Sequence, residues 1–518
     1  MKKFIVIGLA VFWVLSFGTI AHAQKLDFKA SGFIDTATFW GVNTPYAYDL
    51  PPWTSFNAWL PPIYGPSPLF NVGAAGSGFG QALNKERSFW GSRARLKFDA
   101  IMEKNLSGTI FFEMDSGMWG EGQSSDGRNI TGRWAADRAA VEVKNIYIDV
   151  GIPYFGIPLP MTARVGIQPL SVRPHMVVYN DGAGITGGIK IDPVTIEPMY
   201  FKPYEGLDYA ADDIDVYGLN LSATFGTVKV GGFGLYYNQN TYPLTAAISS
   251  TVNFSSNMWW FGVYTDGKVG PVNINFDLVA DTGEVKDRRN ISPRAPDVDY
   301  QGWATRLKVE YPWEKFNFGA VGQYASGSDQ KRTDGGTSVT GGGGLPGNTT
   351  PWGTPTTKVS GYMVPTASEQ FGSGESLLLS GYPVWNGFLG YNSLNYAQMG
   401  RGSIGGTWLA KLYGSYKPTP WYKVTLAGLY IGDTTKHGNT IGNARGFGGT
   451  SPFPRNDGTI GVEFDLINEI NIYKNLKFDV GLGYLLAGDA MDYFNVTTGR
   501  NKSGDDPWVL VTKLTYNF

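Results

Sequence analysis

The chain has 518 residues, a formal net charge of −2 and no cysteine, and only 17% of its residues are charged. The lack of cysteine excludes disulfides, thiolate metal sites and a cysteine nucleophile, and the charge balance gives no basic footprint for nucleic acid. The 70 glycines are about twice the usual share. The 30 Phe, 29 Tyr and 16 Trp residues argue against a disordered chain.

The N-terminus predicts a secretory signal peptide over residues 1–23. Lys2 and Lys3 form a positive start, residues 4–17 are apolar, and Ala21 and Ala23 form a small-residue cleavage site. The apolar run is shorter than the roughly 20 residues that a spanning helix needs. We therefore expect export by the Sec pathway and a mature chain, 24–518, that forms a single domain.

The remaining chain alternates with a period of two, as β-strands do. In residues 273–281, for example, Ile274, Phe276 and Leu278 alternate with Asn275 and Asp277. The same pattern predicts eighteen strands, at about 25–40, 87–103, 106–118, 138–150, 161–170, 182–192, 194–203, 213–225, 227–238, 257–268, 271–283, 299–311, 315–326, 403–417, 421–433, 458–473, 476–488 and 507–518. The alternation changes parity near Lys144 and Asn145, which predicts a β-bulge there.

The predicted connections alternate between short and long. Eight are short turns, and nine are longer loops, of which 41–86 and 327–402 are the longest. Short periplasmic turns that alternate with long extracellular loops are typical of outer-membrane barrels. We predict an all-β fold, a transmembrane antiparallel up-and-down barrel of eighteen strands, with sixteen as the alternative, in the outer membrane of a Gram-negative cell.

The last strand ends in an apolar, aromatic face. Leu514, Tyr516 and Phe518 share one parity at the end of the chain. This face resembles the C-terminal signature that the barrel assembly machinery reads, so we expect these residues to be an assembly signal. The outward wall should then contact outer-membrane lipid and lipopolysaccharide.

Charged residues fall mainly on the opposite, inward parity. Because eighteen strands enclose an aqueous lumen, these side chains are candidate pore-lining residues: Arg93, Arg95, Lys97, Glu113, Asp115, Arg164, Asp277, Arg306, Lys308, Glu463 and Asp465. We expect Arg93, Arg95 and Arg164 to shape part of the constriction. Neighbouring strands of opposite sign could equally pair and neutralise one another, and the mixed signs predict no strong ion selectivity.

Loops and motifs add little chemistry. The loop 327–402 could fold into the lumen, cover its mouth or cap neighbouring subunits. His175 and His437 lie in different loops with no third ligand nearby, and there is no G-x-S-x-G elbow. We predict no catalytic residue, no metal site and no cofactor.

Several segments resemble one protein family. They are 106–113 (LSGTIFFE), 119–120 (WG), 143–149 (VKNIYID) and 164–168 (RVGIQ), with 180–181 and 202–204 downstream. The chain resembles the homotrimeric outer-membrane porins of sulfate-reducing and related Gram-negative bacteria, most densely over 25–205. A looser likeness to alginate-export barrels exists, but an exporter of polyanions should have a strongly basic lumen.

The resemblance implies a trimeric channel through which small hydrophilic solutes and ions diffuse passively. A saccharide- or polysaccharide-specific channel is the first alternative. A barrel that acts as a scaffold or sheath for a partner protein is the second. Planar-bilayer recording separates the three, because only an open porin conducts without a partner and without block by a sugar.

Overall fold

The computed structural model describes residues 26–43, 86–103, 105–119, 141–152, 160–206, 212–242, 254–288, 294–333, 344–365, 375–378, 405–495 and 498–518. The predicted signal peptide, most of the loop 41–86 and the side chain of Asp115 lie outside the described residues.

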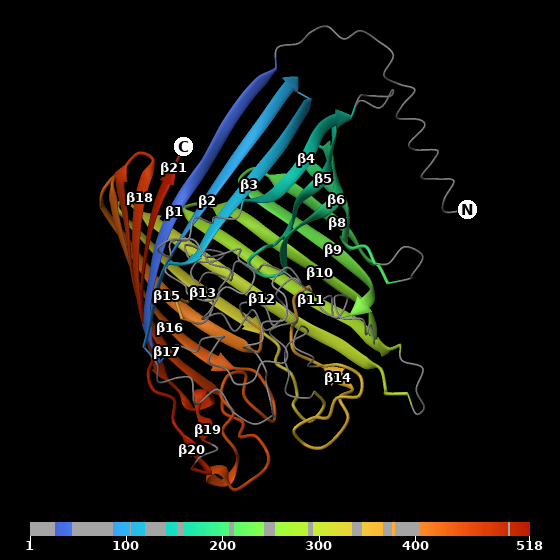
Figure 1. The fold of residues 1–518 in the computed structure, drawn as a ribbon. Helices are drawn as coiled ribbons and strands as arrows, with labels where there is room; N and C mark the ends of the chain where they lie inside the picture. The colour runs from blue at the N-terminus through green and yellow to red at the C-terminus, as the bar shows by residue number, and fades with distance from the viewer. Residues whose placement is uncertain are drawn as a thin grey trace.

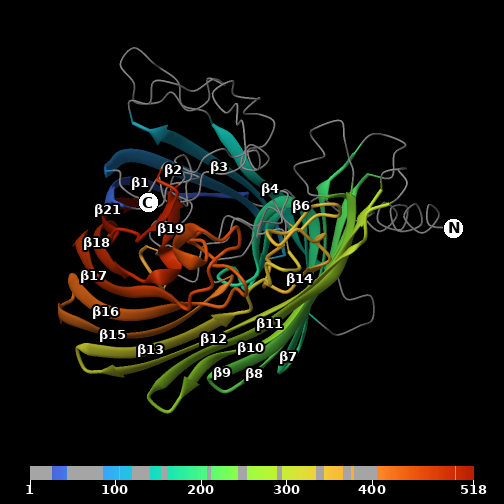
Figure 2. The same ribbon diagram turned by 90° about the horizontal axis from the view of Figure 1, so that it is seen from below.

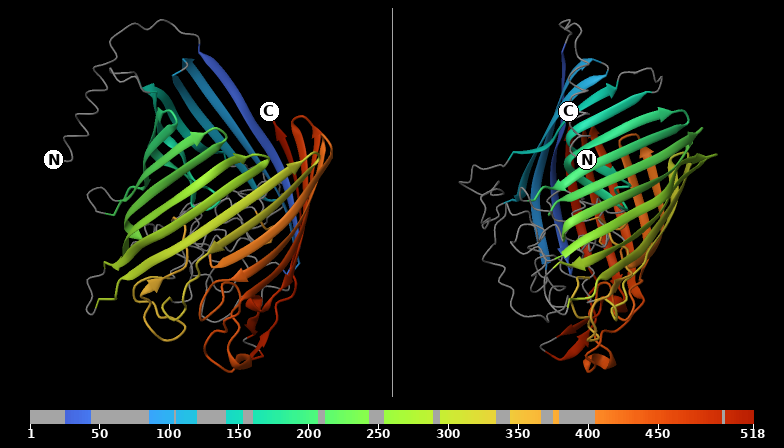
Figure 3. Two further views of the ribbon diagram at one scale, coloured as in Figure 1. Left: turned by 180° about the vertical axis from the view of Figure 1, so that it is seen from behind. Right: turned by 90° about the vertical axis from the view of Figure 1, so that its right-hand side faces the viewer.

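Eighteen long strands pair edge to edge in one closed, antiparallel ring (Figures 1 and 3). In ring order they are β1 (Asp27–Val42), β2 (Glu86–Glu103), β3 (Leu106–Met118), β4 (Glu142–Ile152), β5 (Met161–Val172), β6 (Val178–Ile191), β7 (Val194–Tyr204), β8 (Ile214–Phe225), β9 (Val228–Tyr242), β10 (Phe254–Val269), β11 (Val272–Asp287), β12 (Val298–Trp313), β13 (Phe316–Ala325), β15 (Thr407–Thr419), β16 (Tyr422–Asp433), β17 (Thr459–Tyr473), β18 (Leu476–Ala487) and β21 (Trp508–Asn517). Pairing of β21 with β1, from Phe33↔Asn517 to Val42↔Trp508, closes the ring. The ring itself then has no open edge strand, and an open edge is the usual site of strand-to-strand aggregation.

The ring confirms the predicted eighteen-strand barrel, and the sixteen-strand alternative is wrong. Every predicted segment is a strand whose observed ends lie within four residues of the predicted ones. The turns that link strands in pairs, such as 226–227 and 270–271, lie at one end of the barrel with the C-terminus. We call this the short-turn end, and the opposite end the long-loop end.

The predicted bulge lies at Lys144. Phe111 of β3 pairs with Asn145 of β4, but Phe112 pairs with Val143, so Lys144 is an extra residue in the ladder. A bulge of this kind leaves one residue unpaired and turns its side chain. The Lys144 side chain is consequently buried beside Glu113 and Asp181.

The outer wall is apolar at mid-height and aromatic toward both ends. Leu412 is 71% exposed near the middle of β15. Toward the long-loop end, Tyr236 stacks on Trp259 with ring centres 4.4 Å apart, and toward the short-turn end Phe316 stacks on Tyr416 at 4.7 Å. An apolar band between two aromatic belts is the outer surface of a membrane barrel.

The last strand shows the same alternation. Leu514, Tyr516 and Phe518 are 39%, 47% and 42% exposed, on the apolar outer face of β21. Backbone hydrogen bonds between Gly32 and Phe518 run in both directions, at 2.9 and 3.0 Å, and fasten the chain end to β1. The C-terminal residues therefore help to close the barrel, while their role in recognition during assembly stays a prediction.

Smaller elements gather at the long-loop end. They are β14 (Lys358–Val359), which pairs in parallel with β12, the hairpin of β19 (Tyr493–Asn495) and β20 (Arg500–Lys502), and 3₁₀ turns at Phe447–Gly449 and Asp489–Met491. In the parts of the chain that the structure describes, no helix combines the length and the apolar character needed to cross a membrane.

Candidate channel interior

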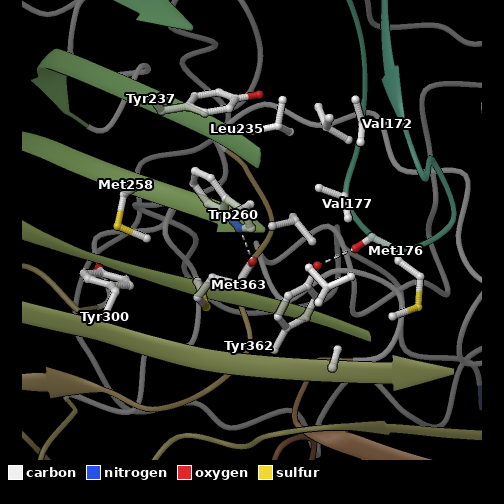
Figure 4. Close-up of a cluster of buried hydrophobic side chains, with 14 of the residues drawn as sticks. Val172, Met176, Val177, Leu235, Tyr237, Met258, Trp260, Tyr300, Tyr362 and Met363 are labelled. Atoms are coloured by element: carbon white, nitrogen blue, oxygen red, sulfur yellow. Dashed lines mark hydrogen bonds between the residues drawn. The ribbon is translucent and has the colours of Figure 1, made fainter. Parts of the chain in front are cut away.

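The loop between β13 and β15 folds into the barrel. In the view from below its segment 344–365 lies within the outline of the ring (Figure 2), with β14 at the long-loop end (Figure 1) and Met363 against the inner wall. Figure 4 shows Tyr362 and Met363 of this segment packed among Trp260, Tyr300 and other buried side chains of the wall. Of the three placements that the sequence left open for the loop 327–402, the described residues show the first two: residues 361–363 and 375–378 lie against the inner wall, and Trp352 stacks on Phe453 of another loop at the long-loop mouth.

Aromatic side chains of the wall hold this segment through its backbone. Trp260 Nε1 donates to the Met363 carbonyl at 2.8 Å, and Tyr300 Oη donates to the Gly344 carbonyl at 2.9 Å. Tyr362 Oη in turn donates to the carbonyl of Met176 at 2.7 Å. Because Met176 belongs to the loop between β5 and β6, this last bond joins two loops inside the barrel.

Asp281 is the carboxylate that anchors the same segment. It is 1% exposed and accepts hydrogen bonds from the backbone N–H groups of Met363 and Gly302, each at 3.1 Å. The approach is close enough that a Cβ on Gly302 would lie 2.5 Å from the Tyr362 Cα and 2.6 Å from the Gly361 carbonyl oxygen. Glycine at position 302 therefore lets the loop lie directly on the wall.

A second segment of this loop, residues 375–378, is held by charge on β12, β15 and β17. Glu375 pairs with Arg306 at 2.5 Å and with Lys411 at 3.2 Å. Burial alone would raise the pKa of the Glu375 carboxyl, but the attraction of Lys411 and Arg306 outweighs it and lowers that pKa. The segment therefore carries a carboxylate to two cations of the wall.

Glu463 binds the same segment with the roles reversed, because here the wall supplies the carboxylate and the segment supplies the hydrogen-bond donors. Its fully buried carboxylate accepts from Ser376 Oγ at 2.6 Å and from the backbone N–H groups of Leu377 and Leu378 at 2.8 and 3.1 Å. Asp465, two residues along β17, is 3% exposed. Two predicted pore residues, Arg306 and Glu463, thus bind a loop.

The loop between β5 and β6 is also anchored inside. Arg173 pairs with Asp266 at 2.6 Å and with Asp277, and its guanidinium lies 4.5 Å from the ring centre of Tyr264. His175 Nε2 lies 2.8 Å from Asp277 Oδ2. Burial opposes the charged form of Arg173, but the hydrogen bonds to Asp277 and Asp266 outweigh burial and raise its pKa.

A third cluster joins β2, β3 and β4. Glu113 lies 3.3 Å from Arg93 and 3.7 Å from Lys144, and it also pairs with Arg95. Lys144 makes a further ion pair with Asp181 at 2.5 Å. The structure thus brings the three predicted residues Arg93, Arg95 and Glu113 together in one cluster, in which opposite charges partly neutralise one another.

The other predicted residues are paired with near neighbours. Arg164 donates to Asp149 at 2.7 and 3.0 Å, Lys97 lies 3.0 Å from Asp99, and Lys308 lies 3.7 Å from Glu310. Whether Arg93, Arg95 and Arg164 line the constriction stays a prediction. Their pairing matches the alternative that the sequence also allowed, in which opposite charges on the wall meet.

Sequence reasoning did not find three of the binding residues. Arg173, Asp266 and Glu375 link residues that are far apart in the chain. Arg173 and Glu375 lie in loops without periodicity, so the only signal in the sequence was a charged residue within a predicted connection. Within the ranges that the structure describes, no three His, Asp or Glu side chains are grouped so as to hold a metal ion.

Comparison with known proteins gives likenesses of structure only. No protein-family model and no curated protein matches the chain. Among solved structures, Pseudomonas aeruginosa OccK8 (OprE) is 11% identical, with 95% of this chain and 98% of that chain covered and a TM-score of 0.48. OccK7 (OpdD) of the same species is 10% identical, with coverages of 95% and 99% and a TM-score of 0.46. The P. aeruginosa outer membrane protein OpdK is 9% identical, with coverages of 95% and 98% and a TM-score of 0.45. Identities and TM-scores this low assign no solute, partner or residue role to the present chain.

Proposed function

We propose that this protein is an outer-membrane porin, a water-filled channel for passive diffusion of small hydrophilic solutes and ions. The observation that carries the proposal is the separation of side chains by the barrel wall. Leu412 and its apolar neighbours face outward, and the ion pairs of Glu113, Asp277 and Glu375 lie inside. A charged interior serves a pore, because the charges that line it act directly on passing ions.

The in-folded loops support a narrowed channel rather than an open tube. The wall holds segments 344–365 and 375–378 through aromatic side chains, cationic side chains and carboxylates. Fixed loops reduce the cross-section of the lumen at the level where they lie. This arrangement favours passage of solutes one small molecule at a time.

The proposal also covers location and assembly. The chain would be exported by the Sec pathway, recognised by the barrel assembly machinery through Leu514, Tyr516 and Phe518, and inserted among outer-membrane lipid and lipopolysaccharide. The short-turn end would face the periplasm. A homotrimer follows from the resemblance of 106–113 and 143–149 to trimeric porins.

Planar-bilayer recording with purified, refolded protein tests the channel. We expect stepwise, ohmic current without any added partner. A protein that never conducts would instead favour the scaffold alternative. A current that maltooligosaccharides block at micromolar concentration would favour the saccharide channel.

Gel electrophoresis without boiling tests the barrel and the trimer together. A folded barrel migrates differently from the boiled chain, and a trimer adds a slow band that boiling removes. Chemical crosslinking in the native membrane is the control for association during extraction. A single monomeric species under both conditions would contradict the homotrimer.

A further inference from the structure

The carboxylates at mid-height of the barrel are either paired with cations or buried. The carboxylates of Glu113 and Glu375 each pair with two or more cationic groups of the interior, and Asp277 pairs with Arg173 and contacts His175. Glu463 is occupied by the loop segment 375–378. Asp281, Glu463 and Asp465 have no cation among the described ion pairs, but they are at most 3% exposed, so a passing ion does not contact them. We therefore look for the source of any ion preference among the exposed charges that are not paired.

Four such charges lie near the short-turn end. Lys29 is the third residue of β1, Lys190 and Lys268 are the penultimate residues of β6 and β10, and Lys229 is the second residue of β9. All four are exposed, and among the described residues none has a carboxylate oxygen within the 4.0 Å of an ion pair. We call them the mouth lysines.

The alternation of each strand turns the mouth lysines toward the lumen. Lys229 shares the face of the buried Phe233 and Leu235, and its ammonium lies 5.9 Å from the ring centre of Tyr264. Lys268 shares the face of Tyr264 and Asp266. Asp266 pairs with Arg173 of the loop inside the barrel, so this face points toward the lumen. Side chains on this parity point away from the lipid, so they do not serve as anchors for lipid phosphates.

The side chains of Lys29 and Lys190 also point toward the lumen. Lys29 pairs in register with Asp99, which bonds to Lys97 and Thr109 of the inner wall. Lys190 shares the face of Thr186, which donates to the buried Gln168. The mouth lysines therefore come from widely separated parts of the ring, β1, β6 and the β9–β10 pair.

The rest of this rim is also basic. Lys315, Lys417 and Lys474 lie in or beside its turns and are exposed. The exposed acidic side chains described there are Asp27, Asp192 and Glu314. Lys423 and Lys477 belong to the same end but share Glu469, and Lys477 also pairs with Asp479, so they add little net charge.

We propose that the mouth lysines make the channel prefer small anions, and that the preference is set at the short-turn mouth and not at the narrowed mid-height. The proposal rests on the proposed function as a channel. Unpaired charges act on ions within about 10 Å at 0.1 M salt, so a basic ring raises the local concentration of anions at the mouth.

The test replaces the four lysines together, as Lys29→Gln, Lys190→Gln, Lys229→Gln and Lys268→Gln. The measurement is the permeability ratio of chloride to potassium, taken from the reversal potential in a KCl gradient. We expect a ratio above one in the unmodified channel and a fall of at least about twofold in the variant. A matched control removes four lysines from the long-loop end, as Lys286→Gln, Lys331→Gln, Lys436→Gln and Lys502→Gln, and should keep the original ratio.

Each outcome decides a separate claim. A channel that conducts with an unchanged ratio in the first variant, or with an equal fall in the control, overturns the anion preference and leaves the porin proposal intact. A protein that passes no current overturns both.

A salt series on the unmodified channel does not depend on the folding of any variant. Raising KCl from 0.1 M to 1 M shortens the screening length from about 10 Å to about 3 Å. The chloride preference should then fall toward one. A preference that persists at 1 M would contradict control by exposed lysines.

Discussion

Single carboxylates of the wall act as attachment points for whole loops. Asp281 accepts two backbone N–H groups, one of them from the in-folded segment 344–365, and Glu463 accepts two backbone N–H groups and one hydroxyl of the segment 375–378. Hydrogen bonds to a charged acceptor are roughly twice as strong as neutral ones. One residue on a rigid strand can therefore fix a loop that has little regular structure of its own.

Replacing Glu463 by alanine should loosen the segment 375–378. Loss of three hydrogen bonds to a buried carboxylate leaves two backbone N–H groups without an acceptor and should cost about 2–4 kcal/mol. We expect larger current fluctuations in single-channel recordings, because the segment then moves within the lumen. Ser376→Ala is the matched control, since it removes only one of the three bonds and should give a much quieter channel. Equal noise in Glu463→Ala and the unmodified channel would contradict the attachment.

At the scale of elements, strands could be predicted and loop placement could not. A strand such as β11 shows its lumen and lipid faces in its own alternation, and the same local pattern revealed the bulge at Lys144. The contact between Glu375 and Arg306 joins residues 69 positions apart, in a loop without periodicity. The inward charges and their possible pairing between neighbouring strands were therefore predicted, but their partners in the loops were not, because those contacts depend on how the loop folds back.

The close approach of a loop to β12 makes Gly302 a critical position. A side chain there would overlap the backbone of Gly361 and Tyr362. We expect Gly302→Val to destabilise the barrel by about 1–3 kcal/mol, the usual cost of overpacking. Gly322→Val on the neighbouring strand β13 is the control, because nothing lies within 4 Å of a Cβ at that position. Urea unfolding in detergent micelles measures both, and similar losses at the two glycines would refute the contact.

The whole molecule combines an apolar outside with a polar inside, the reverse of a water-soluble fold. The outer wall exposes Leu412 and Leu426 by 71% and 63%, whereas Asp277 and Glu463 are fully buried. In water such a surface would cause aggregation. In a bilayer the same surface is stabilised by contact with acyl chains, and the polar groups inside meet one another, the loops and water.

The loss of stability caused by a charged side chain on the outer face should therefore depend on its depth in the bilayer. Leu412 near mid-height and Tyr473 at the short-turn end of β17 are both 71% exposed on the outer face. An arginine costs about 2–4 kcal/mol at the bilayer midplane and about 0–1 kcal/mol near an interface. Leu412→Arg should accordingly lower the free energy of unfolding in phospholipid vesicles by the larger amount, and Tyr473→Arg by the smaller. Tryptophan fluorescence during denaturant unfolding measures both variants under one condition. Equal costs at the two positions would show that mid-height of this wall does not lie within a lipid bilayer.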